Sequence, residues 1–158
     1  MEKDLLLGEE TRELEILEFR AGGNSYGVDV NDIRELLPYD KDITPVPNAH
    51  PYIEGIIMPR DFLIPIVDIV KSLKLNESDE NKNEMIMVTS INDQNIAFHV
   101  DSLAGIHRTT NKAVTKPGKK LSTSMKEAVI GILDVNNKKV EILELRNIIT
   151  YINPELKF

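Results

Sequence analysis

Residues 55–73 read GIIMPRDFLIPIVDIVKSL, and residues 131–149 read GILDVNNKKVEILELRNII. The two stretches align without a gap, so that glycine lies over glycine, apolar residues lie over apolar residues, and Asp68 lies over Glu144. In each stretch two apolar runs flank a short polar turn, a pattern typical of a β-hairpin. The same hairpin therefore occurs twice in the chain.

A second repeated pair precedes these hairpins. Residues 25–33 (SYGVDVNDI) align with residues 95–103 (NIAFHVDSL). Each member follows a strand-like run and a polar turn. The first run, 14–19 (LEILEF), alternates apolar and acidic residues, and the second, 85–91 (MIMVTSI), is almost continuously apolar. Two matches in the same order indicate a duplicated β unit.

The two halves are divided by the stretch NESDENKNE at residues 76–84, which has no apolar residue. Burial would leave its charges without water, so we predict a surface loop. We expect one domain over residues 13–152, an amino-terminal segment over 1–12 and a tail over 153–158, because a chain of 158 residues is long enough for one core. The residue pattern predicts a mainly β fold with two small barrel-like halves.

Short helices are expected over residues 30–37 and 69–75, and a last one from Glu144 or Leu145 to Ile152, before Asn153 and Pro154. The first would be capped by Asn31 or Asp32 and would end before Pro38, because proline cannot continue a helix. The second would be capped by Asp68, whose side chain can accept from free backbone N–H groups.

Composition excludes several classes of function. The formal net charge of −7 would repel a nucleic acid, so we expect no nucleic-acid partner. The chain has no cysteine, which excludes disulfides, zinc–thiolate sites and thiol nucleophiles. Its amino terminus does not resemble a signal peptide, and no run of about 18 apolar residues occurs, so we expect no membrane insertion. These features agree with a cytoplasmic protein.

No known catalytic motif appears, and we therefore predict a protein that is not an enzyme and needs no cofactor. A nucleophile elbow, a phosphate-binding loop and a His-Glu-x-x-His motif are all absent from the sequence. One alternative stays open. His99 and Asp101 are two residues apart and would share a face of a strand, and His107 could add a third ligand, as in a metal-binding or small-molecule-binding β domain.

Five motifs, taken in order, resemble the CheW-like domain, the coupling module of bacterial chemotaxis arrays. They are NSYGVDVNDIRELLPY (24–39), ITPVPNAHPYIEGII (43–57), LIPIVDIVKSL (63–73), AFHVDSLAGIHR (97–108) and VIGIL (129–133), together with an arginine-containing turn. The resemblance covers residues 13–152. ELEILEF near the start and YINPE near the end look most like the amino-terminal domain of CheV-type coupling proteins, which carry a receiver domain after it.

The resemblance implies two intertwined five-stranded barrels of SH3-like type, joined by short helices. It also implies an adaptor that links the cytoplasmic tips of chemoreceptors to the regulatory domain of the histidine kinase CheA. Such a protein would lie in the cytoplasm and be recruited to receptor arrays at the inner face of the membrane. The chemistry would occur on its partners.

Family site residues carry over to a few positions. The receptor-facing groove maps onto Ile33, Arg34 and Glu35, expected on the short helix after the second strand, and onto Gly55 and Arg60. The kinase contact of the family uses exposed apolar side chains, which we assign to no single residue here.

The arginine turn departs from the family. The family turn reads Asn-Leu-Arg-Gly, whereas here Met58, Pro59, Arg60 and Asp61 occupy it. Proline suits the second position of a type I turn, which would place Arg60 third. We therefore predict a type I turn with an exposed Arg60 that pairs in part with Asp61.

Overall fold

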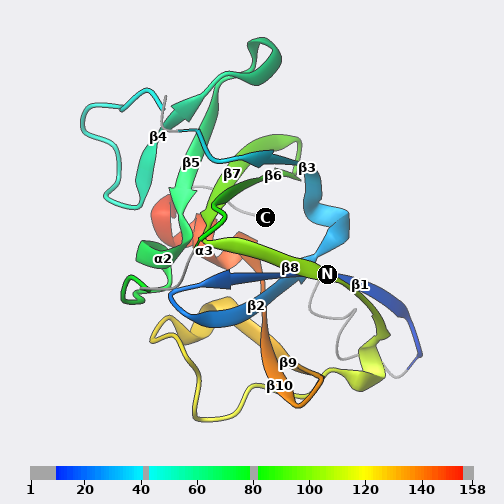
Figure 1. Ribbon diagram of the computed structural model, residues 1–158. Helices are drawn as coiled ribbons and strands as arrows, with labels where there is room; N and C mark the ends of the chain where they lie inside the picture. The colour runs from blue at the N-terminus through cyan, green and yellow to red at the C-terminus, as the bar shows by residue number, and fades with distance from the viewer. Residues whose placement is uncertain (1–9, 41–42, 79–81, 155–158) are drawn as a thin grey trace.

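The computed structural model describes residues 10–40, 43–78 and 82–154, and its ten strands form two five-stranded sheets (Figure 1). The first sheet has the order β8-β1-β2-β10-β9 and consists of β1 (Glu13–Ala21), β2 (Asn24–Asp29), β8 (Ser102–Thr110), β9 (Val129–Val135) and β10 (Lys138–Leu143). The second has the order β3-β6-β7-β5-β4 and consists of β3 (Ile33–Pro38), β4 (Ile53–Ile57), β5 (Ile64–Asp68), β6 (Met85–Ile91) and β7 (Gln94–Val100).

Each sheet takes strands from both halves of the chain. Strands β1 and β2 of the first half pair with β8 and β10 of the second, and β3 and β5 pair with β6 and β7. If β1 to β5 are exchanged with β6 to β10 in order, the strand order of one sheet becomes that of the other. The predicted duplication and the two intertwined five-stranded units are confirmed. Neither half forms a barrel from its own strands alone.

One large apolar core joins the two sheets. It contains Phe19 and Tyr26 of the first sheet and Phe98 of the second, all fully buried, together with Ile69 and Leu145 from the helices. Each sheet also has a smaller apolar cluster of its own, one around Ile16 and Ile142 and one around Ile66 and Val88. The shared core binds the two sheets into one folded unit.

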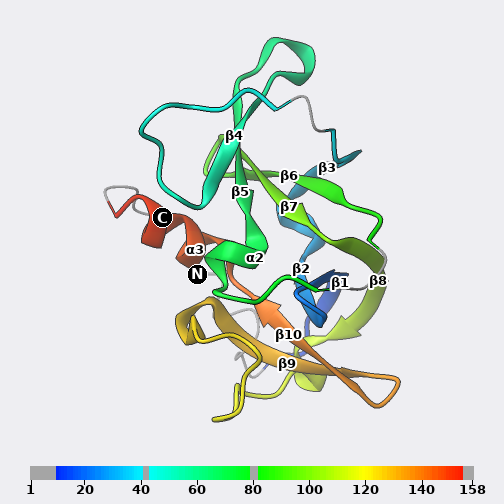
Figure 2. The ribbon, with the colours of Figure 1, turned by 60° about the vertical axis from the view of Figure 1, so that its left-hand side comes forward.

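Two helices lie at the junction of the sheets (Figure 2), and both follow the sequence prediction in part. Helix α2 (Ile69–Ser72) is capped by Asp68, which accepts from the Lys71 backbone N–H at 3.2 Å, and it ends three residues earlier than expected. Helix α3 (Leu145–Ile152) has the predicted bounds. Within the described residues, no helix is long and apolar enough to cross a membrane.

The helix predicted over residues 30–37 is wrong. A 3₁₀ turn (Val30–Asp32), capped by Asp29, leads directly into strand β3. Along β3, half-buried and exposed residues alternate, because the strand pairs antiparallel with β6, with Leu36 opposite Met87. The apolar residues of this stretch fit a helix period as well as a strand period, and the partner strand decides between them.

Candidate protein-docking site

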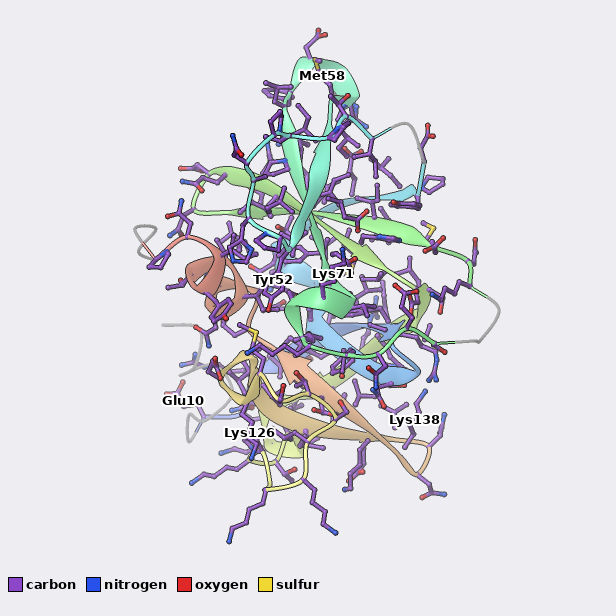
Figure 3. All side chains as sticks on the ribbon, turned by 90° about the vertical axis from the view of Figure 1, so that its left-hand side faces the viewer. Glu10, Tyr52, Met58, Lys71, Lys126 and Lys138 are labelled. Atoms are coloured by element: carbon purple, nitrogen blue, oxygen red, sulfur yellow. The ribbon has the colours of Figure 1, made fainter. Side chains whose placement is uncertain are left out.

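The β4–β5 hairpin projects from the second sheet, and its tip exposes large apolar side chains. Figure 3 shows Met58 at the far end of the molecule. Met58, Phe62 and Leu63 are 62%, 55% and 63% exposed, respectively. Three such side chains together on one projection form an exposed apolar patch of the kind that marks protein–protein contacts.

Strand β3 supports this tip from the side with charged residues. The Arg34 guanidinium carbon lies 5.8 Å from the centre of the Phe62 ring, a cation–π distance. Arg60 Nη2 donates to Glu35 Oε2 at 2.8 Å. We call the set Arg34, Glu35, Met58, Arg60, Phe62 and Leu63 the tip surface. It combines exposed apolar side chains with charged groups, a composition found in docking surfaces.

The turn at the tip is not of type I. Arg60 has φ 56° and ψ 42°, and Asp61 has φ 68°, so two consecutive residues are left-handed. The Phe62 N–H donates to the Pro59 carbonyl at 3.4 Å, which places Pro59 first in the turn. Two left-handed residues match the twist of a two-residue hairpin, whereas a type I turn would splay the strands.

Arg60 itself lies as exposed as predicted, with 70% of its side chain open to solvent. Its partner is Glu35 of β3, so the predicted pairing with Asp61 is wrong.

Gly55 has a different place from the other predicted site residues. It is buried in β4, where a Cβ would meet the Thr44 carbonyl oxygen and would lie 2.5 Å from Ile43 Cγ2. This close approach allows Thr44 and Ile56 to exchange two backbone hydrogen bonds of 3.1 and 2.8 Å. Gly55 therefore allows the segment around Thr44 to lie against the hairpin, and it offers no surface of its own.

Of the five predicted receptor-facing residues, the structure brings three together at the tip surface: Arg34, Glu35 and Arg60. Arg34 and Glu35 lie on strand β3 rather than on the short helix predicted for them, and Arg60 lies in the turn between β4 and β5. Ile33 is half-buried and packs against the shared core. Sequence reasoning missed Met58, Phe62 and Leu63, because apolar residues beside a strand look like core residues. The structure shows that Phe62 and Leu63 precede the first paired residue of β5, Ile64, and so lie outside the ladder.

The three residues of the alternative metal site are engaged elsewhere. His99 lies between two glutamates, Asp101 accepts from the Gly22 backbone N–H at 2.9 Å, and His107 Nε2 lies 2.7 Å from Glu18. Within residues 10–40, 43–78 and 82–154, no three His, Asp or Glu side chains are arranged to hold a metal ion. Nothing in the geometry favours the metal-binding alternative.

A cluster around His99 lies beneath the hairpin and was not predicted. His99 Nδ1 is 2.5 Å from Glu54 Oε2, His99 Nε2 is 3.1 Å from Glu84 Oε1, and the Tyr39 ring stacks on the imidazole at 3.7 Å. Burial lowers the pKa of His99, but the hydrogen bond to Glu54 and the negative charges of Glu54, Glu84 and Asp68 outweigh it and raise the pKa. The cluster ties the base of β4 to β7.

Comparison with known proteins gives a consistent result. The family model of the CheW-like domain matches residues 15–153. A chemotaxis protein CheW from Thermotoga maritima is 35% identical over 104 residues, covering 66% of this chain and 68% of that protein. The chemotaxis protein CheV3 of Helicobacter pylori is 28% identical over 148 residues, covering 87% of this chain and 47% of CheV3.

Among solved structures, the crystal structure of the scaffolding protein TtCheW from Thermoanaerobacter tengcongensis superimposes with a TM-score of 0.75. The identity is 25%, and the match covers 84% of this chain and 90% of that chain.

Proposed function

Because this chain belongs to the CheW-like domain family, we propose that its tip surface is where it docks on a chemoreceptor within the coupling assembly of bacterial chemotaxis. The chain is a chemotaxis coupling adaptor, a member of a family of scaffolds rather than of a known family of enzymes. Its proposed partners are the cytoplasmic tip of a chemoreceptor and the regulatory domain of the histidine kinase CheA. Its proposed place is the cytoplasmic face of the receptor array.

One observation supports the tip surface above the others. Three large apolar side chains are more than half exposed at the end of one hairpin, and two arginines lie beside them. Such exposure brings no benefit to the fold, since burial of one such side chain would stabilise it by roughly 1.5–3 kcal/mol. A partner that covers the tip recovers this free energy on binding. Arginine and aromatic residues also dominate the binding energy of protein interfaces.

Arg60 and Glu35 indicate which charged group of a partner the tip surface can bind. A receptor tip that offers a carboxylate would bind Arg60 in place of Glu35, and a guanidinium can hold a carboxylate with two parallel hydrogen bonds. The Glu35–Arg60 pair is mostly exposed on its arginine side. Such ion pairs contribute about 0–1 kcal/mol to stability, so replacing Glu35 by a carboxylate of the receptor would cost little free energy.

The test uses two tip variants, Arg60→Glu and Phe62→Ser, with Ile106→Ser as a matched control, because Ile106 is 56% exposed on β8, away from the hairpin. Both tip variants should bind a receptor cytoplasmic fragment roughly 30-fold more weakly, the effect of losing about 2 kcal/mol at a hot spot. The control should bind normally. All three should keep their unfolding free energy within about 0.5 kcal/mol.

Affinity is measured by titration calorimetry with the receptor fragment, and then with CheA. If both tip variants bind the receptor fragment as tightly as the unaltered chain does, the tip surface is not the receptor-docking site. If the same variants lose CheA instead, the surface is a docking site for the kinase, and the assignment to the receptor is wrong.

A further inference from the structure

Positive charge is concentrated in one part of the sequence. Residues 102–126 contain six of the 19 Lys and Arg residues and none of the 26 Asp and Glu residues. The rest of the chain is therefore strongly acidic, although the net charge of the whole is only −7. Such segregation is a feature of charge patterning that composition alone hides.

The structure places the centre of this segment on a long loop between the 3₁₀ turns Asn111–Ala113 and Lys126–Ala128. The loop (yellow in Figure 1) lies at the end of the molecule opposite the β4–β5 tip, and Figure 3 shows Met58 at one end and Lys126 in the opposite half. Lys116, Lys119 and Lys120 on the loop are exposed, as is Lys126 at its end. None of these four lysines has an ion pair within the described part of the chain. We call residues 116–121 the lysine loop.

The lysine loop is anchored at both ends. On one side Thr115 exchanges two backbone hydrogen bonds of 2.9 Å with Ile132 of β9. On the other side the Ser122 backbone N–H donates to the Glu141 carboxylate at 3.1 Å, and the buried Thr123 hydroxyl donates to the Leu73 carbonyl oxygen. A loop held in this way loses less conformational entropy when a partner binds than a free segment would.

Glu141, which lies under the lysine loop, does not neutralise the charges of the lysines. Glu141 is buried, and its carboxylate accepts from both the backbone N–H and the hydroxyl of Ser122. Ser122 also shares a hydrogen bond of 2.6 Å with the Tyr26 hydroxyl. Glu141 therefore fixes the base of the loop, and the three lysines above it face solvent.

We propose that the lysine loop docks an acidic segment of a second partner protein, at the end of the molecule opposite the tip surface. An extended polyanion or a flat anionic bilayer would also face the acidic remainder of the chain and be repelled by it. A short segment rich in Asp and Glu would contact only the lysine loop, because it does not extend to the acidic remainder of the chain. The inference rests on the proposed function, since an adaptor that holds two proteins at once needs two separate surfaces.

The experiment titrates the ¹⁵N-labelled chain of residues 1–158 with a synthetic peptide of alternating Glu and Ser at low salt. Amide shifts should concentrate on residues 115–126 and should shrink as salt is added, because the contacts are exposed charges. The triple variant Lys116→Glu, Lys119→Glu, Lys120→Glu should bind the peptide at least roughly tenfold more weakly than the unaltered chain does. The matched control Lys71→Glu, Lys74→Glu, Lys139→Glu changes the net charge equally at exposed lysines elsewhere and should bind within about twofold of the parent.

Three results would overturn the inference: shifts scattered over the surface, an equal loss in the control triple, or binding of phosphatidylglycerol vesicles or an oligonucleotide through the loop without any response to the peptide. A parallel co-precipitation of receptor fragment and CheA separates this inference from the proposed function. If the unaltered chain fails to link the two proteins, the proposed function is wrong whatever the peptide does. If it links them but ignores the peptide, only the lysine-loop inference is wrong.

Discussion

Replacing His99 by Gln should destabilise the protein in a manner that depends on pH. The His99 side chain is only 14% exposed and lies between Glu54 and Glu84, at 2.5 and 3.1 Å, with Tyr39 stacked on its ring. Tyr39 also donates its hydroxyl to the second Glu54 oxygen at 2.8 Å. The charged groups that face the imidazole, Glu54, Glu84 and Asp68, are all acidic, so the fold favours its protonated form.

The sign of the effect follows from the raised pKa of His99. Its stabilising contribution is fully present below the unfolded-state pKa of about 6.5 and is lost as pH rises through the higher folded-state pKa. A charge-assisted hydrogen bond to the mostly buried Glu54 contributes roughly 1.5–3 kcal/mol. The contact with Glu84, whose side chain is a third exposed, adds less than about 1 kcal/mol. Gln can restore one neutral donor to Glu54, which leaves a net loss of about 2 kcal/mol near pH 6.

At a pH above the raised folded-state pKa of His99, by contrast, the imidazole of the unaltered protein is neutral, and the difference between it and the variant should fall to about 0.5–1 kcal/mol. The assay is urea unfolding of both proteins at the two pH values and constant ionic strength, monitored by far-UV circular dichroism. The slope of the free energy of unfolding against urea concentration should be the same for both proteins. A double-mutant cycle with Glu54→Gln should show coupling at the lower pH and little at the higher.

Equal destabilisation at both pH values would refute the reasoning and would make His99 a packing residue. An NMR titration that gives the folded protein a His99 pKa below the ordinary value would refute the sign of the argument independently.

Three further outcomes are expected. Lys138→Met removes a cation that lies 2.6 Å from the fully buried Glu18 and should lower the free energy of unfolding at pH 7 by roughly 2 kcal/mol; a loss below about 0.5 kcal/mol in urea unfolding would contradict this. Gly55→Ala should destabilise by about 1–3 kcal/mol and speed hydrogen exchange at the Thr44 amide, and undiminished protection of that amide would contradict it. Asp61→Gly should stabilise by roughly 0.5–1 kcal/mol, because Asp61 is left-handed, and a lower thermal midpoint would count against this.

Features of the fold that depend on neighbouring residues could be predicted from the sequence. The cap at Asp68 follows from its place before an apolar run, and the strands follow from alternation. The turn at Arg60 also had a sequence signal, because its counterpart in the repeat is Asn136-Asn137, a pair suited to left-handed backbone, and both asparagines are left-handed. The prediction from Pro59 alone failed because it ignored that alignment.

Features that depend on distant residues could not be predicted from local pattern. The choice of strand for residues 33–38 depends on pairing with β6, which lies across the loop between the halves. The exchange of strands between halves was expected only from the family resemblance, since no residue pattern states which strand pairs with which. The His99 cluster assembles Tyr39, Glu54 and Glu84 from three separate segments, and only the folded chain brings them together.

The exchange of strands also has a consequence for how the protein is made. During synthesis β1 and β2 leave the ribosome before the other described strands, but the strand that pairs with the free edge of β2 is β10, the last of the ten described strands. The first sheet therefore cannot close until β10 has been synthesised, and β3 to β5 must likewise wait for β6 and β7. Such long-range pairing slows folding and leaves apolar strand edges exposed in the nascent chain. We expect chains truncated before residue 138 to aggregate rather than to fold in part.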